Sequence, residues 1–265
     1  MRSSRVVLAA VAFAALMPVL SASAQKKVVV SHDEWLTNGP NNGALEFNAN
    51  EQQFVGNALD WFGVSSGANV LIYTDDPYIT NHTFTDWLVS RGYTVTVASA
   101  PASLSGYDVV FGEGNPSFDA SGLASYVMNG GNVMYMGGTG IGGAVAEAGY
   151  SNAFLNMFGL SFAAAYNGLG TVNTTGFDGQ NPFGPALFSG VSSVFANNGQ
   201  DISSFSVADV TNQVFYDARQ NGVFAAAQVT ATPEPMSLTL LATGMVGVFG
   251  AARRRRRLAS GSTIA

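Results

Sequence analysis

YDVVFGEGNPSFDASGLASYVMNGGNVMYM, residues 107–136, is the stretch of sequence that decides the fold. It begins and ends with short apolar runs, YDVVF and NVMYM, which have the length and composition of buried strands. The segment between them, from about Ser117 to Met128, has an amphipathic helical pattern that ends at Gly130 and Gly131. A strand, a helix and a second strand in this order form the repeating unit of parallel sheets.

The same alternation extends in both directions from this stretch. Further strands are expected at residues 27–31, 69–74 and 93–98. Further helices are expected from Asn50, which forms a capping-box-like pattern with Gln53, to Gly63, from Asn81 to Gly92, and from Gly143 to Phe158. This order predicts an α/β fold with a doubly wound, mostly parallel sheet of flavodoxin-like type.

From Ser161 onward the pattern changes. Residues 167–198 are rich in Gly, Asn, Ser and Pro and predict long loops, and a short strand is expected at 205–207. The runs 214–218 and 223–228 flank Gln220-Asn221-Gly222, which is a strong signal for a β-hairpin. We therefore expect a C-terminal hairpin beside the parallel sheet.

The composition limits the function classes that fit residues 25–229, which are long enough for one domain with a sizeable core. Seven of the eleven basic residues and one of the seventeen acidic residues lie in the two end segments. Four basic and sixteen acidic residues remain for the domain, a net charge of −12. Nucleic acid is not an expected partner, because phosphate binding needs a basic face. The chain has no cysteine, which excludes disulfides and thiol chemistry.

The first 24 residues have the three parts of a secretory signal peptide. Arg2 and Arg5 precede an apolar run from Val6 to Leu20, and Ala22 and Ala24 occupy the positions that signal peptidase reads. Export through the Sec translocon with cleavage after Ala24 is therefore expected. The alternative is that this segment remains as a membrane anchor.

The other end of the chain carries a second apolar segment. Residues 236–252 are 17 uncharged, mostly apolar residues, near the lower limit for a transmembrane helix. The triplet Pro233, Glu234 and Pro235 precedes them, and a basic block follows that consists of Arg253, Arg254, Arg255, Arg256 and Arg257. Positive flanks resist translocation, so the block is expected to stay in the cytoplasm as a stop-transfer signal.

A Pro-Glu-Pro triplet, a short transmembrane segment and an arginine cluster in this order resemble the PEP-CTERM sorting signal, here residues 230–257, with a tail at 258–265. The resemblance implies that an exosortase in the inner membrane recognises residues 233–235 and cleaves near them. It also implies a destination at the cell surface or in the extracellular matrix, with exopolysaccharide as a candidate partner. The alternative is an ordinary C-terminal anchor.

The domain between the two ends resembles the class I glutamine amidotransferase-like superfamily, including its ThuA-like members. The resemblance rests on the order of elements and on phrases such as LSGYDVV (104–110) and LASYVMNGGNV (123–133). Enzymes of that superfamily place a cysteine on the turn after a central strand, where this chain has Gly140. Amidotransferase chemistry is therefore excluded. Thr139 alone is a poor substitute, because an alcohol nucleophile needs a positioned base.

The same turn matches part of the dinucleotide-binding pattern, with glycines at 138, 140 and 143. It follows the fifth strand rather than the first, and the acidic residue that would bind the ribose is missing. Glycines that permit a tight turn are the simpler interpretation. No cofactor is expected.

Several polar residues are expected at the carboxyl ends of the parallel strands, the edge where ligands bind in such sheets. The candidate ligand site consists of His32, Asp33, Asp75, Asp76, Glu113, Gly138, Thr139 and Gly140. His32 with one of the carboxylates could act as an acid–base pair or hold a metal, although the spacing assigns no metal ligands. The alternative is that these residues cap helices and make loops polar.

Two functions fit these observations. The first is a surface or matrix protein whose domain binds or supports other components without catalysis. The second is a secreted hydrolase or carbohydrate-active enzyme that uses His32 and the strand-end carboxylates. Whether His32 and the carboxylates lie within hydrogen-bond distance of one another distinguishes them.

Overall fold

The computed structural model describes residues 26–38, 46–101, 103–117 and 119–230. The expected signal peptide and the expected transmembrane helix at 236–252 lie outside these residues. Within the described ranges, no helix has both the length and the apolar character needed to cross a membrane.

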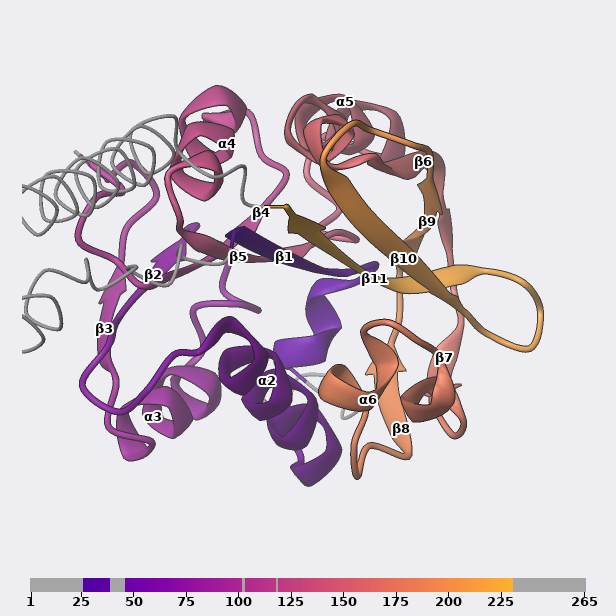
Figure 1. Cartoon of the computed structure of the whole chain (residues 1–265), viewed down its shortest axis with the longest axis horizontal. Coiled ribbons are helices and arrows are strands. Elements are labelled where there is room, and N and C mark those ends of the chain that lie inside the picture. The colour runs from indigo at the N-terminus through magenta and orange to yellow at the C-terminus, as the bar shows by residue number, and fades with distance from the viewer. Residues whose placement is uncertain (1–25, 39–45, 102, 118, 231–265) are drawn as a thin grey trace, which may run out of the picture. The chain divides into compact units, whose positions relative to one another are not determined.

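The centre of the fold is a sheet of seven strands (Figure 1). Their order across the sheet is β10 (Val210–Tyr216), β11 (Gly222–Val229), β1 (Lys26–Ser31), β5 (Asn132–Met136), β4 (Val109–Glu113), β2 (Asn69–Tyr73) and β3 (Thr94–Val97). Strands β1, β5, β4, β2 and β3 are parallel, whereas β11 is antiparallel to β1 and to β10. The expected α/β class with a mostly parallel sheet is confirmed, and β10 and β11 form the expected hairpin.

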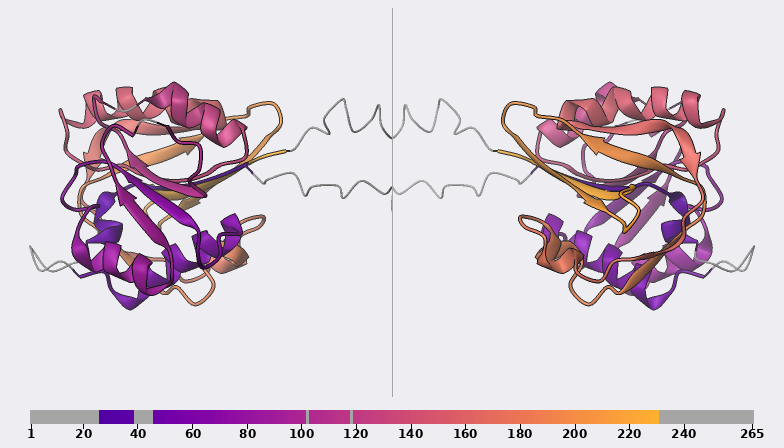
Figure 2. Two further views of the ribbon diagram at one scale, coloured as in Figure 1. Left: turned by 90° about the vertical axis from the view of Figure 1, so that its left-hand side faces the viewer. Right: turned by 90° about the vertical axis from the view of Figure 1, so that its right-hand side faces the viewer.

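Helices cover both faces of the sheet, as Figure 2 shows from two sides. Helices α2 (Ala49–Phe62) and α3 (His82–Ser90) pack on one face, and α4 (Ala120–Met128) and α5 (Ala144–Leu155) on the other. Successive strand residues point to opposite faces, so Ile72 and Phe111 contact the first helical layer while Leu71 and Val110 contact the second. Two apolar cores therefore enclose the strands, as expected for a doubly wound sheet.

The chain reverses its direction across the sheet between β2 and β4. It passes from β2 outward to β3, and then returns to β4 on the other side of β2 before it continues to β5. Ligands of open α/β sheets bind outside the carboxyl ends of the strands at such a switch point. The residues that follow β2 and end β4 are therefore the first place to look for a site.

Residues 167–198 do not form the expected long loops, and two further strands flank them. Residues 160–204 contain β6 (Leu160–Asn167), β7 (Gly170–Asn173), β8 (Ser193–Ala196) and β9 (Gly199–Ser204), and the helical turns η2 (Asn156–Phe158), η3 (Phe177–Gly179) and α6 (Gly184–Leu187) border or interrupt them. Strand β6 pairs with β9, and β7 pairs with β8, in two small antiparallel sheets. The prediction was wrong because each short strand buries few apolar side chains, so no period appears in the sequence. The expected strand at 205–207 is not formed.

Two element ends also differ from the predictions in ways that matter later. Helix α2 begins two residues early, because Asn48 is its N-cap and forms a capping box with Glu51. Its end at Gly63, in the left-handed region with φ of 79°, is as expected. Strand β4 continues two residues beyond the expected end, and this extension carries Glu113 into the buried layer.

The capping box predicts that Asn48 contributes more to the stability of the domain than the nearby Asn50 does. Replacing Asn48 with Ala should lower the free energy of unfolding by about 1 kcal/mol, because the backbone N–H groups of residues 50 and 51 lose their acceptor. Asn50→Ala is the matched control, since the Asn50 side chain only accepts from Ser192 at the surface. Equilibrium urea unfolding measures both. A larger loss for Asn50→Ala than for Asn48→Ala would contradict the cap assignment.

Candidate functional site

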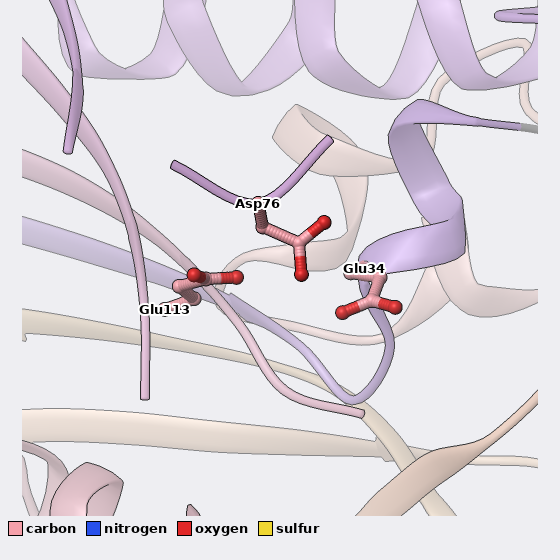
Figure 3. Close-up of side chains that lie close together, drawn as sticks. All are labelled: Glu34, Asp76 and Glu113. Carbon is pink, nitrogen blue, oxygen red and sulfur yellow. The ribbon is translucent and has the colours of Figure 1, made fainter. Parts of the chain in front are cut away.

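Three buried carboxylates meet at the carboxyl edge of the sheet (Figure 3). Glu34 opens the 3-10 helix η1 (Glu34–Thr37) after β1, Asp76 lies in the loop after β2, and Glu113 ends β4. One oxygen from each lies within 4.8 Å of the other two. We call these three residues the carboxylate cluster. Two of its members lie at the switch point between β2 and β4.

Local hydrogen bonds hold two members of the cluster, Asp76 and Glu113, in place. Asp76 Oδ1 accepts from the backbone N–H of Tyr78 at 2.7 Å, and its own N–H donates to Thr74 Oγ1 at 2.8 Å. The Thr74 hydroxyl in turn donates to Glu113 Oε1, which also accepts from Asn115 Nδ2 at 3.4 Å. Thr74 therefore connects the end of β2 to the end of β4 through the carboxylates.

One oxygen of Glu34 and one of Glu113 lack a hydrogen-bond partner. Glu34, Asp76 and Glu113 are 2%, 7% and 0% exposed, and the Oε2 atoms of both glutamates are fully buried without a partner. Buried polar atoms are normally satisfied, so two orphaned oxygens in one cluster need an explanation. Figure 3 shows that the three carboxylates point toward one another rather than into separate pockets.

In two other buried carboxylates near this edge, both oxygens accept hydrogen bonds. Asp33 accepts from the backbone N–H groups of Trp35 at 3.0 Å and Asn198 at 2.7 Å, and also from that of Asn197. Glu147 accepts from the Thr139 N–H at 3.0 Å and the Tyr166 hydroxyl at 2.8 Å. The unmet oxygens of the cluster are therefore a property of that site and not of every buried acid in the domain.

Burial and mutual repulsion favour the protonated forms of the cluster. Burial, together with the smaller effect of the nearby charges of Asp76, Asp33, Glu113 and Glu147, raises the pKa of Glu34 to about 11. Burial raises the pKa of Glu113 to about 7 against the opposing hydrogen bond from Thr74. It also raises the pKa of Asp76. The charged groups that act on Glu34 are all carboxylates, and no Lys, Arg or His is among them.

The structure does not bring His32 into the cluster. His32 is fully buried, and neither ring nitrogen has a hydrogen-bond partner. Its ring lies edge-on to Phe224 and against Gly199, where an added Cβ would come within 2.0 Å of Nδ1. Burial lowers the pKa of His32 to about 3, opposed by the charge of Asp217. The expected pairing of His32 with a strand-end carboxylate is therefore not formed.

The remaining predicted residues have other environments. Asp75 is exposed, although it directly precedes Asp76. Gly138 and Gly140 adopt positive φ angles of 78° and 74°, and a Cβ on Gly138 would come within 3.0 Å of the Asn198 carbonyl oxygen. Thr139 Oγ1 accepts from the backbone N–H of Ile141 at 3.3 Å. The turn after β5 is thus held by Glu147 and shaped by glycine, which accounts for its sequence without a ligand.

Glu34, Thr74 and Asn115 belong to the site but were not predicted. Each lies within three residues of a strand end, and this position is the signal that could have identified them. Comparisons with models of protein families, with curated proteins and with solved structures found no match to this chain. The site is therefore interpreted from its own chemistry. A group of carboxylate oxygens can bind a hard cation or retain protons.

The raised pKa of Glu113 predicts a pH dependence of stability. Between about pH 4.5 and pH 7 the folded domain retains a proton that the unfolded chain has lost, so Glu113 makes folding less favourable as the pH rises through this window. Asp33 and Glu51 have raised pKa values of about 6 and about 7, so they too make folding less favourable as the pH rises. His32 has a lowered pKa and therefore makes folding more favourable as the pH rises.

Glu113→Gln imitates the protonated form and removes this contribution. In metal-free buffer, the stability of the variant relative to the wild-type chain should rise by on the order of 2 kcal/mol between pH 5 and pH 7.5. Urea unfolding at both pH values measures the difference. The exposed Asp60→Asn serves as control and should follow the wild type. An equal difference at the two pH values would show that Glu113 is charged throughout.

Proposed function

We propose that this chain is an exported surface or matrix protein that an exosortase processes near its C-terminus. The observation that carries the proposal is the order of three parts at residues 233–257: the Pro-Glu-Pro triplet, the apolar segment and the five arginines. The N-terminal pattern that ends at Ala24 supports export through the Sec translocon with cleavage by signal peptidase. The inner membrane holds the chain in transit, and the domain at 25–229 faces outward.

We further propose that the domain is a flavodoxin-like fold of the amidotransferase-like kind. The strand order β3, β2, β4, β5 supports this assignment, because it is the flavodoxin-like order with β2 as the first strand. Strand β1 and the β10–β11 hairpin extend the sheet beyond β5. The turn after β5 is where the superfamily resemblance places a nucleophile, and here that turn contains Gly140.

The domain acts by binding or support rather than by catalysis. The chain has no cysteine. The Thr139 hydroxyl accepts the backbone N–H of Ile141 and also bonds the Glu147 carboxylate, and it does not pair with His32. His32, the base that a hydrolase would need, lies outside the carboxylate cluster with both nitrogens unpaired. The cluster itself is 7% exposed or less, which leaves no surface for a sugar ring at its carboxylates. The partner that the PEP-CTERM resemblance implies, an exopolysaccharide of the envelope or matrix, would then contact the outer surface of the domain.

The sorting proposal predicts a host-dependent loss of the C-terminus. The chain is expressed in its own host with and without the exosortase, the cells are fractionated, and intact mass is measured. The mature chain should begin at Gln25 in both strains, and should end near residues 233–235 only where the exosortase is present. A variant with Ala at positions 233, 234 and 235 is the matched control and should keep its tail.

Either of two results would reject this proposal. A tail retained in the membrane of both strains would leave a simple anchored domain. Loss of the tail from both strains, or from the Ala variant, would assign the cleavage to another protease. Because the readout is chain mass, neither result depends on whether the domain binds a ligand.

A further inference from the structure

We propose that the carboxylate cluster of Glu34, Asp76 and Glu113 is a binding site for one Ca²⁺ ion. Nothing in the proposed sorting function requires such a site, and the inference rests on the described part of the domain alone. Its basis is twofold: Glu34 and Glu113 each have a buried Oε2 atom without a hydrogen-bond partner, and one carboxylate oxygen from each of the three residues lies within 4.8 Å of the other two.

The orphaned oxygens set this cluster apart from an ordinary buried acidic group. Asp33, Glu147 and Glu51 are also buried acids, and in each of them both oxygens accept a hydrogen bond. Glu34 and Glu113 retain an oxygen for which the surrounding protein provides no donor. A cation in the space that the three carboxylates face satisfies both oxygens at once and compensates their charge.

The surrounding hydrogen bonds orient the carboxylates as the outer shell of a metal site does. Thr74 and Asn115 both bond Oε1 of Glu113, so its Oε2 is the oxygen that remains free. The Tyr78 N–H bonds Oδ1 of Asp76 and so fixes the orientation of this carboxylate. Partners that fix one oxygen and leave the other open are typical of ligating carboxylates.

The donor set and its spacing point to Ca²⁺ among the common cations. All ligands are carboxylate oxygens, without the nitrogen or sulfur that zinc and copper sites favour. Two oxygens on opposite sides of one ion lie up to about 4.6–5.2 Å apart for Ca²⁺ but only about 4.0–4.2 Å for Mg²⁺. The three ligand oxygens all lie within 4.8 Å of one another, a bound that is compatible with one shared Ca²⁺ ion. Ca²⁺ also accepts the uneven geometry of three different chain segments.

Calcium should stabilise the chain, and Tb³⁺ bound in the same site should accept energy from nearby aromatic rings. The full chain in detergent micelles is freed of metal with EDTA and titrated with CaCl₂ or MgCl₂ while thermal unfolding is followed. At a concentration of Ca²⁺ ten times its Kd, Tm should rise by about 3–6 °C. Tb³⁺ in the site should luminesce on excitation of Trp35 and Tyr78, whose stacked rings adjoin Glu34 and Asp76 in sequence, and Ca²⁺ should quench this signal by displacement.

Variants of the cluster should respond in two opposite ways. Glu34→Gln and Glu113→Gln imitate the protonated side chains that burial favours in the metal-free cluster, so each metal-free variant should melt at or above the temperature of the metal-free wild type. Each should nevertheless bind Ca²⁺ at least tenfold more weakly and lose most of the Tb³⁺ signal. A variant that only misfolds cannot give this combination. Glu51→Gln is the matched control, because Glu51 is a buried glutamate of the α2 capping box, and its Ca²⁺ response should equal that of the wild type.

Three results would overturn the inference. Tm that does not change with CaCl₂ would show that the cluster is a protonated group without a metal. A Ca²⁺ response that survives in Glu113→Gln and Glu34→Gln would place the ion elsewhere. A response to Mg²⁺ as large as that to Ca²⁺ would reject calcium as the preferred ion. Since all readouts are made without the exosortase, they are independent of the fate of the sorting proposal.

Discussion

The burial of β4 on both faces and at both edges is the constraint on which the rest of the structure depends. All five of its residues are buried, because β2 and β5 flank it and helices cover the sheet above and below. Its last residue is Glu113, so the architecture forces a carboxylate into the interior. Thr74, Asn115, Asp76 and Glu34 are arranged around that carboxylate, and the chemistry of the edge follows from this one burial.

Much of the central sheet could be predicted from the sequence because its strands are apolar on both faces and need no partner to be recognised. NVMYM was placed at the observed residues, and QNG gave the correct hairpin. The small sheets of residues 160–204 could not be predicted, since β7 and β8 gain their stability from pairing with each other and bury only Val172, Val194 and Ala196. The cap of α2 was misplaced by two residues because Asn48 and Asn50 carry the same side chain.

The sequence predicted the edge of the sheet at which the candidate site lies, but not the way in which each side chain at that edge points. The rule that strand ends share one edge correctly brought together Asp76 and Glu113. The same rule included His32, which follows β1 but turns its ring toward Gly199 and Phe224. Glu34 was missed because its place in the cluster depends on the 3-10 turn that Asp33 caps, and a pattern of strands contains no information on that turn.

A cation at this edge would also provide a link between distant segments of a chain that has no cysteine. A domain that lacks cysteine has no covalent links between distant segments, and it must be held together by its core. Glu34, Asp76 and Glu113 come from the ends of three strands that are far apart in the sequence and close together in the sheet. One ion shared among them would tie these ends to one another, as a disulfide does in many secreted proteins. Its stabilising effect would then depend on the free cation concentration around the domain and not on the redox state.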